Sequence, residues 1–169
     1  MSPVIFVLGG ARSGKSTYAE RLIEATGLPK IYVATAQAFD AEMQARIEEH
    51  RARRSGWQTI DAPLELANVL HAQSGKGNAI LVDCLTLWLT NLLMAEHDIA
   101  SAFHVLLGVL RRADHPIVLV SNEVGLGIVP ENALARAFRD HTGRLHQMIA
   151  AEAGQVHFIA AGLPMKLKG

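Results

Sequence analysis

Residues 9 to 16 have the types and spacing of a loop that binds phosphate, because they fit G-x-x-x-x-G-K-[ST] without deviation. Glycines let the backbone curl so that successive N–H groups point at phosphate oxygens, and the helix that follows adds its positive end. A chance glycine-rich turn is the alternative, but an apolar strand precedes the loop and a helical pattern follows it. The predicted nucleotide-binding residues here are Gly9, Gly10, Ala11, Arg12, Ser13, Gly14, Lys15 and Ser16.

Within this loop, Lys15 is expected to reach the outer phosphates and Ser16 to hold Mg²⁺. Such a loop needs a second magnesium partner, usually an acid at the end of another buried strand. Asp83 follows the apolar run Ala79–Val82, at the sheet edge where ligands bind in open α/β folds. The pattern predicts Asp83 as that partner. Its alternative role is the N-cap of a helix that starts near Leu85.

The most charged stretch of the chain is Asp40–Arg53, which has the pattern of a helix. Met43, Ile47, His50 and Arg54 share one face, so His50 is expected to look toward the protein body. One interpretation is a solvated helix with Glu–Arg pairs four residues apart. The other is a triphosphate clamp, in which a neutral imidazole attacks phosphorus and the neighbouring arginines stabilise the developing charge.

Short continuous apolar runs alternate with longer helical patterns, as in a parallel sheet buried on both faces. An α/β fold with right-handed crossovers is therefore expected. The predicted strands are Val4–Leu8, Ile31–Ala34, Ala79–Val82, Ile117–Val120 and Val156–Ala160. The predicted helices are Lys15–Ala25, Asp40–Arg53, Leu64–Gln73, Leu85–Glu96, Ile99–Arg112 and Asn132–Glu152.

Composition restricts the class of protein. A chain of 169 residues, half of them apolar, suits one compact domain and excludes intrinsic disorder. Sixteen acidic and sixteen basic residues give no global attraction to nucleic acid or anionic membrane. With Cys84 as its single cysteine, the chain has no disulfide framework or cysteine zinc site, and a cytoplasmic setting is expected. The longest apolar stretch, Leu85–Ala95, is about half of the ~20 residues that a membrane span needs, so no span is expected.

Several strings together resemble one family, in order and over nearly the whole chain. They are the phosphate loop, residues 32–36 (YVATA), 46–51 (RIEEHR), 57–63 (WQTIDAP), 82–86 (VDCLT) with 91–93 (NLL), and 121–130 (SNEVGLGIVP). The sequence resembles the bifunctional adenosylcobinamide kinases / adenosylcobinamide-phosphate guanylyltransferases of cobalamin biosynthesis. The string from Asn122 to Pro130 is far more specific than the phosphate loop.

The resemblance implies a P-loop NTPase (RecA-like) fold, with a mainly parallel sheet and helices on both faces, and a single kinase/guanylyltransferase domain over residues 1–169. It implies that ATP or GTP phosphorylates adenosylcobinamide and that GTP then guanylylates a histidine. The GMP passes to adenosylcobinamide phosphate, giving adenosylcobinamide-GDP. It also implies Mg²⁺ as cofactor, no nucleic-acid partner and a homotrimer.

The resemblance also implies roles for particular residues. The nucleophile is His50, the histidine of the Arg-Ile-x-x-His string, and Lys15 is the second catalytic residue. Magnesium binds to Ser16 and Asp83. The further contacts to the nucleotide or its magnesium are Thr35, Ala36, Gln37, Arg51, Ala52, Arg53, Arg54, Asp61 and Asp83.

Two positions depart from the family pattern: Asp61 replaces a glutamate and His146 an asparagine. Asn122 and Glu123 either bind the corrinoid or hold a strained loop. Cys84 is expected to be a small buried apolar residue, and the apolar stretch Leu85–Leu93 a helix buried in the core or against another subunit. The remaining histidines are expected to be surface or capping residues: His71, His97, His104, His115, His141, His146 and His157.

Three functions remain open from the sequence. The first is the bifunctional corrinoid enzyme. The second is another small-molecule kinase, which needs the phosphate loop but not His50. The third is a non-catalytic nucleotide-binding module, which needs neither an acceptor site nor a magnesium acid. A signalling GTPase is not expected, because the Asn-Lys-x-Asp guanine signature is absent.

Overall fold

The computed structural model describes residues 2–37, 45, 48, 52 and 54–169. Its strands form one sheet in the order β3-β2-β4-β5-β1-β6-β7, in which β7 alone is antiparallel to its neighbour. The strands are β1 (Val4–Gly9), β2 (Lys30–Ala34), β3 (Trp57–Asp61), β4 (Ala79–Asp83), β5 (Ile117–Asn122), β6 (Gln155–Ala160) and β7 (Leu163–Lys168).

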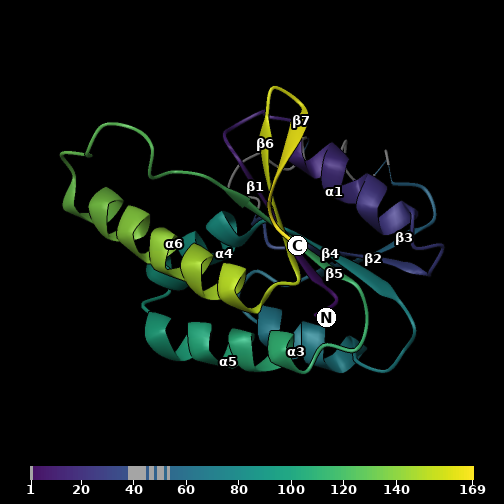
Figure 1. Ribbon diagram of the computed structural model, residues 1–169. Helices are drawn as coiled ribbons and strands as arrows, with labels where there is room; N and C mark the ends of the chain where they lie inside the picture. Colours follow the sequence, from purple (N-terminus) through teal and green to yellow (C-terminus); the bar gives the residue numbers. More distant parts are fainter. Residues whose placement is uncertain (1, 38–44, 46–47, 49–51, 53) are drawn as a thin grey trace.

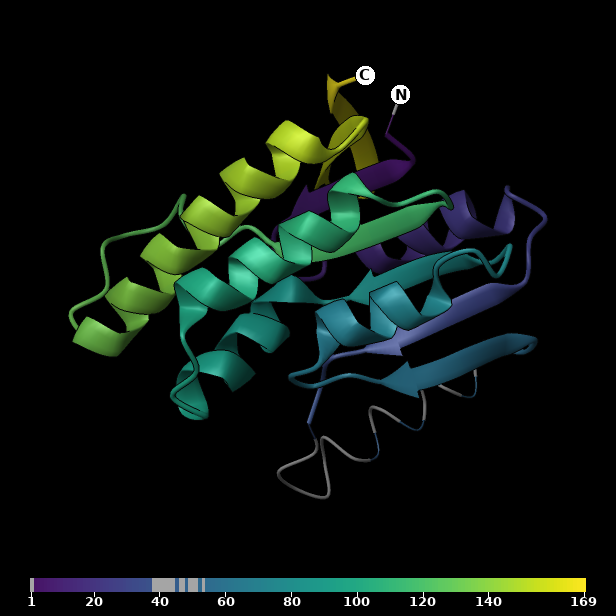
Figure 2. The same ribbon diagram turned by 90° about the horizontal axis from the view of Figure 1, so that it is seen from below.

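Helices cover both faces of the sheet (Figures 1 and 2). Helix α1 (Lys15–Glu24) lies on one face, and the other described helices lie on the opposite face. These are α3 (Leu66–Gln73), α4 (Leu85–Met94), α5 (Ile99–Arg111) and α6 (Ala133–Glu152). The central strands are therefore buried on both sides, which explains their continuous apolar runs.

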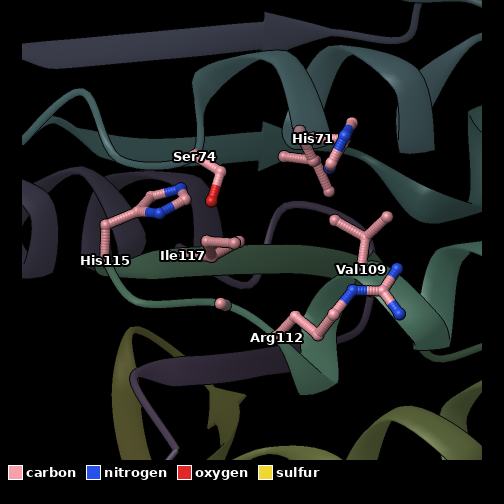
Figure 3. A pocket seen from close by; sticks show the side chains of 8 residues that line it. His71, Ser74, Val109, Arg112, His115 and Ile117 are labelled. Atoms are coloured by element: carbon pink, nitrogen blue, oxygen red, sulfur yellow. The ribbon is translucent and has the colours of Figure 1, made fainter.

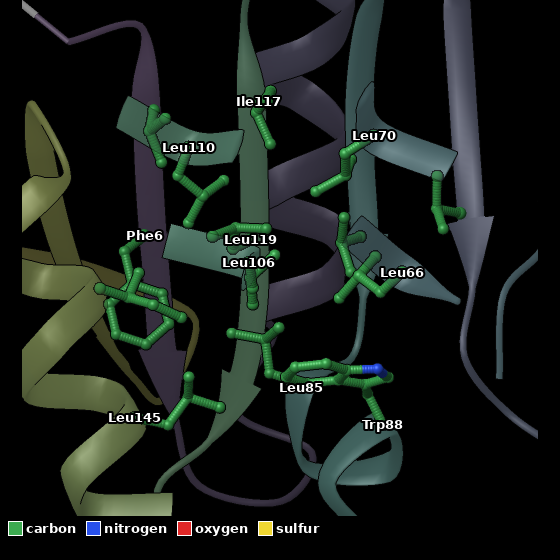
Figure 4. Close-up of a cluster of buried hydrophobic side chains, with 14 of the residues drawn as sticks. Phe6, Leu66, Leu70, Leu85, Trp88, Leu106, Leu110, Ile117, Leu119 and Leu145 are labelled. Atoms are coloured by element: carbon green, nitrogen blue, oxygen red, sulfur yellow. The ribbon is translucent and has the colours of Figure 1, made fainter. Parts of the chain in front are cut away.

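The larger hydrophobic cluster fills the space between the sheet and the helices of the four-helix face (Figure 4). There Phe6 and Leu119 of the sheet pack with Leu106 of α5, Leu145 of α6 and Trp88 of α4. The smaller cluster joins α1 to the other face of the sheet. Most residues of helix α4 are buried inside their own chain. This burial accounts for apolar residues on nearly all sides of the helix without a second subunit.

The predicted fold class is confirmed, and the five predicted strands are present. Strands β3 and β7 were missed, because continuous apolar runs mark only strands buried on both faces. β3 lies at one edge of the sheet and mixes polar with apolar residues, and all six residues of β7 are exposed at the other edge. The expected helix Asp40–Arg53 lies largely outside the described residues; Ala45, Glu48 and Ala52 are helical and exposed.

The interpretation of the histidines was wrong at three positions. His115, His146 and His157 are each at most 7% exposed. At least one ring nitrogen of each lies within hydrogen-bond distance of a polar side chain, which lowers the cost of burying the imidazole. Sequence alone did not indicate those partners, because the nearest in space can lie far along the chain, as Ser121 does for His146.

Candidate active site

The register of the sheet brings the carboxyl ends of six strands to one edge. Ala34 of β2 is aligned with Asp61 of β3 and with Asp83 of β4, and Gly9 of β1 is aligned with Asn122 of β5 and Ile159 of β6. The predicted phosphate loop begins at Gly9. Predicted site residues from distant parts of the sequence are thus gathered at the carboxyl edge, where open α/β sheets bind ligands.

The phosphate loop has the backbone conformation that its glycines require. Gly14 has φ of 92° and is the N-cap of α1 without a side-chain cap, so the first N–H groups of the helix stay open toward the loop. Arg12 also has a positive φ, 54°, and its side chain is exposed. A Cβ on Gly9 would lie 2.5 Å from Ser13 Oγ and 2.7 Å from the Ile159 carbonyl oxygen, so no larger residue fits there without a shift.

Lys15 is buried at the base of the loop, where Nζ donates to the Gly10 carbonyl oxygen (2.8 Å). Burial lowers the pKa of Lys15, and the nearby carboxylate of Asp83 partly opposes this shift. Within the described residues Ser13 Oγ is buried without a hydrogen-bond partner. The loop therefore holds an amine and a hydroxyl in a desolvated setting, where each gains from an anionic partner.

The side chains of Ser16 and Asp83 are in contact, although 67 positions separate them in the sequence. Ser16 Oγ donates to Asp83 Oδ2 at 2.9 Å. Both groups are hard oxygen donors of the kind that Mg²⁺ prefers, and no described residue donates to Asp83 Oδ1. The pair fits a magnesium ion. The N-cap alternative for Asp83 is wrong, since the N-cap of α4 is Cys84.

A second donor reaches the same carboxylate oxygen. Tyr32 OH donates to Asp83 Oδ2 at 3.2 Å, and the guanidinium carbon of Arg54 lies 3.4 Å from the centre of the Tyr32 ring. Arg54 Nε also donates to Glu20 Oε1 of α1 (3.0 Å), and its side chain is 4% exposed. Arg54, expected at the nucleotide, is thus packed between β2 and α1.

The sequence did not indicate Tyr32 or Glu20 as site residues. Tyr32 is an aromatic residue with a polar hydroxyl in the otherwise apolar run Ile31–Ala34 of β2, which is a signal that its hydroxyl has a buried partner. Burial raises the pKa of Tyr32, and Asp83 adds to the shift, so its hydroxyl remains a donor. Glu20 carries no comparable signal, because only the fold places Arg54 beside α1.

Thr35 supports the end of β4 with its side chain. It is fully buried, and its hydroxyl donates to the Cys84 carbonyl oxygen (2.7 Å) and accepts from the Cys84 N–H (2.8 Å). The Thr35 carbonyl oxygen accepts from Asn91 Nδ2 of α4 (2.7 Å). Ala36 and Gln37 follow at the same edge and are partly exposed. The described contacts of the Thr35 side chain therefore secure the backbone beside Asp83.

Several predicted residues lie outside the described part of the chain, namely His50, Arg51 and Arg53. Ala52 is helical and exposed, and Asp61 is exposed at the carboxyl end of β3. Cys84 is buried as expected, and burial raises the pKa of its thiol. The described residues include no group of three histidine, cysteine or acidic side chains that could hold a metal.

The segment after β5 begins beside the phosphate loop. Glu123 N–H donates to the Gly9 carbonyl oxygen (2.9 Å), Glu123 Oε1 accepts from Gly125 N–H, and Asn122 Nδ2 donates to Thr86 Oγ1 (3.1 Å). Through these contacts, Asn122 and Glu123 hold the segment after β5 beside the start of the phosphate loop. Beyond them Leu126, Ile128 and Val129 are all exposed.

His146 supports β5 from α6. Its Nε2 lies 2.7 Å from Ser121 Oγ, and its ring meets Phe6 edge-on. Burial lowers the pKa of His146 to about 4, and Glu123 partly opposes the shift. A neutral imidazole that accepts from the Ser121 hydroxyl fits this setting. His146 therefore secures the strand that ends at Asn122.

A hollow lies at the opposite edge of the sheet, between α3, α5 and the first residue of β5, Ile117 (Figure 3). His71, Arg112 and His115 line it, and His115 Nδ1 pairs with Asp114 Oδ1 at 2.8 Å. The phosphate loop is at the carboxyl edge, so this hollow is not part of the predicted site.

The fold and site together define a P-loop nucleotide-binding α/β protein of RecA-like architecture. A solved ATPase from the type III secretion system of pathogenic bacteria aligns with 96% of this chain and 56% of its own, at 14% identity and a TM-score of 0.56, which shows the shared fold alone. The chain thus spans little more than half of that ATPase. No helix in the described part of the chain is long and apolar enough to cross a membrane.

The family model for cobinamide kinase / cobinamide phosphate guanyltransferase matches residues 5–167. The bifunctional adenosylcobalamin biosynthesis protein CobP of Pseudomonas aeruginosa is 52% identical over 166 residues, covering 96% of each chain. CobU of Escherichia coli, with the same description, is 40% identical over 181 residues, covering 98% of this chain and 99% of its own. This chain belongs to the cobinamide kinase / cobinamide phosphate guanyltransferase family.

Proposed function

We propose that this protein phosphorylates adenosylcobinamide and then transfers GMP to the product through a guanylyl-histidine at His50. The observation that carries the proposal is the family match over residues 5–167, together with the gathering of Lys15, Ser16 and Asp83 at one sheet edge. The two relatives described above are both named as bifunctional.

The first reaction is a phosphoryl transfer. The aminopropanol hydroxyl oxygen of adenosylcobinamide attacks the γ-phosphorus of ATP or GTP, the bond from the γ-phosphorus to the bridging oxygen breaks, and the nucleoside diphosphate leaves. The loop N–H groups and Lys15 hold the phosphates and stabilise the charge that develops there. Magnesium at Ser16 and Asp83 would neutralise charge on the phosphates when bound.

The second reaction proceeds by two displacements. A nitrogen of His50 attacks the α-phosphorus of GTP, and pyrophosphate leaves as the bond to the β-phosphate oxygen breaks. A phosphate oxygen of adenosylcobinamide phosphate then attacks the same phosphorus, and the P–N bond breaks. Protonation of the imidazole makes it a good leaving group, which is the advantage of a covalent intermediate.

The same proposal includes the finer points implied by the resemblance. Arg51, Ala52, Arg53 and Asp61 contact the nucleotide or its magnesium. Three chains form a homotrimer, and the protein works in the cytoplasm, where ATP and GTP are supplied and the Cys84 thiol stays reduced.

The decisive experiment is labelling with α-³²P GTP and Mg²⁺, followed by denaturation. The wild type should retain label that is acid-labile and alkali-stable, as a phosphoramidate is. His50→Ala should retain none, because no nucleophile remains. His71→Ala is the matched control, since His71 is an exposed histidine of α3 at the far edge of the sheet.

Equal labelling of His50→Ala and the wild type would refute the assignment of His50. Phosphorylation of adenosylcobinamide without any labelled protein would indicate the kinase alone. Nucleotide binding with neither reaction would indicate a binding module.

A further inference from the structure

Asp83 receives both of its described hydrogen bonds on one oxygen. Ser16 Oγ donates to Oδ2 at 2.9 Å, and Tyr32 OH donates to the same oxygen at 3.2 Å. When a carboxylate oxygen is held by fixed donors, the carboxylate plane is held with it. If a magnesium ion takes the Ser16 hydroxyl as a ligand, Tyr32 is the donor among the described residues that still orients Asp83.

The Tyr32 ring is itself secured on several sides. The Arg54 guanidinium lies over one face at 3.4 Å, and Trp57 meets the ring edge-on with centroids 6.5 Å apart. Arg54 is in turn fixed by Glu20 Oε1 of α1 at 3.0 Å. A buried cation over a phenol ring is strongly attracted to it, because little water competes for the charge. The hydroxyl of Tyr32 therefore has little freedom to leave Asp83.

We propose that Tyr32 is a positioning residue for the magnesium carboxylate Asp83, and that Arg54 and Glu20 act by holding the Tyr32 ring. In this arrangement Arg54 serves the metal indirectly and does not bind the nucleotide. The inference rests on the proposed function only in taking Ser16 and Asp83 as the magnesium site; it requires neither the corrinoid nor His50.

Tyr32→Phe tests the hydroxyl, because phenylalanine keeps the ring beneath Arg54. The probe is Mn²⁺ in the presence of α,β-methylene-GTP, which His50 cannot cleave, with free Mn²⁺ followed by electron paramagnetic resonance. Loss of a residue that orients a metal ligand typically costs about 10- to 100-fold in metal affinity, and a loss of about tenfold is expected here. Nucleotide affinity in EDTA should be unchanged.

Tyr18→Phe is the matched control. Tyr18 also contributes a tyrosine hydroxyl with one polar side-chain partner, His157 Nδ1 at 3.2 Å, but it does not contact Asp83. This variant should bind Mn²⁺ as the wild type does. Wild-type Mn²⁺ affinity in Tyr32→Phe would overturn the proposal, and so would an equal loss of nucleotide affinity in EDTA.

Arg54→Met tests the indirect role of the arginine. Arg54→Met should weaken Mn²⁺ binding and leave nucleotide affinity in EDTA unchanged. Added to Tyr32→Phe, it should cause no further loss of Mn²⁺ affinity, because both changes act through the Tyr32 hydroxyl. A loss of nucleotide affinity in EDTA would instead place Arg54 on the nucleotide. The Mn²⁺ measurements stand even if no corrinoid reaction is found, so the two proposals fail separately.

Discussion

At the scale of the residue, Lys15 is a buried amine whose described partner is a backbone carbonyl oxygen of its own loop. Lys15→Ala should slow both the kinase reaction and the labelling of the protein by a similar large factor, if one loop serves both. Removal of one preorganised donor to a transition-state charge typically costs about 10²- to 10³-fold in rate. Both rates are measured with saturating substrates.

Lys76→Ala is the control for the lysine variant, since Lys76 is an exposed lysine in the turn after α3. It should leave both rates unchanged. Kinase turnover that survives in Lys15→Ala would show that the kinase nucleotide binds elsewhere.

His146 gives the stability of the protein a pH dependence. Its folded pKa of about 4 lies below its unfolded value of 6.5, so the unfolded chain binds more protons between these values. The contribution of the neutral His146 imidazole to the free energy of unfolding is fully present above pH 6.5 and is lost as the pH falls toward 4. Between pH 7 and pH 5 the loss in the free energy of unfolding is about 2 kcal/mol.

Urea denaturation at pH 7 and pH 5 measures this difference. His146→Asn should reduce the pH dependence by about 2 kcal/mol, whatever its stability at pH 7. His97→Asn, at an exposed histidine between α4 and α5, should keep the wild-type dependence. If the free energy of unfolding of His146→Asn changed between pH 7 and pH 5 as much as that of the wild type, the proposed shift in the pKa of His146 would be wrong.

At the scale of the element, the phosphate loop depends on close packing between two strand ends and the β6–β7 turn. Gly162 N–H donates to the Ser13 carbonyl oxygen (2.8 Å), and Gly9 lies against Ser13 and Ile159. Gly9→Ala must displace the Ile159 backbone, so it should lower the free energy of unfolding by about 1–3 kcal/mol and weaken nucleotide binding. Thermal and urea denaturation report the first effect, and nucleotide titration the second.

Gly143→Ala is the contrasting variant within α6. A Cβ there meets no atom within 4 Å, and alanine favours a helix over glycine by up to about 1 kcal/mol. It should be neutral or stabilising. A Gly9→Ala protein as stable as the wild type would show that the loop has more room than the described contacts allow.

At the scale of the whole molecule, the proposed homotrimer is tested by sedimentation equilibrium. The expected mass is three times the chain mass of 18.3 kDa. Helix α4 is the candidate contact, and it leaves Leu87 and Met94 exposed, at 38% and 70%. Met94→Asp should lower the mass, because a buried charge without a partner is costly at an interface.

Met165→Asp on strand β7 is the comparison, since Met165 is also an exposed methionine, at 49%. A trimer that survives Met94→Asp but not Met165→Asp would move the contact from α4 to the β7 edge. A single-chain mass for the wild type would refute the trimer.

The sequence predicted those parts of the fold and site that depend on neighbouring residues. The phosphate loop, the strands buried on both faces and the acid at the end of β4 all have local patterns. Edge strands such as β7 have no such pattern, because their residues are exposed and need not be apolar.

The sequence by itself determined a phosphate loop on a parallel α/β sheet, since the loop spacing and the apolar runs are patterns of neighbouring residues. The tertiary structure alone decided the partners of polar groups: Asp83 with Ser16 and Tyr32, Arg54 with Glu20, His146 with Ser121. These pairs are separated by 25 to 67 positions. A buried polar group must find a partner, but the order of the strands, and not the sequence around it, decides which one.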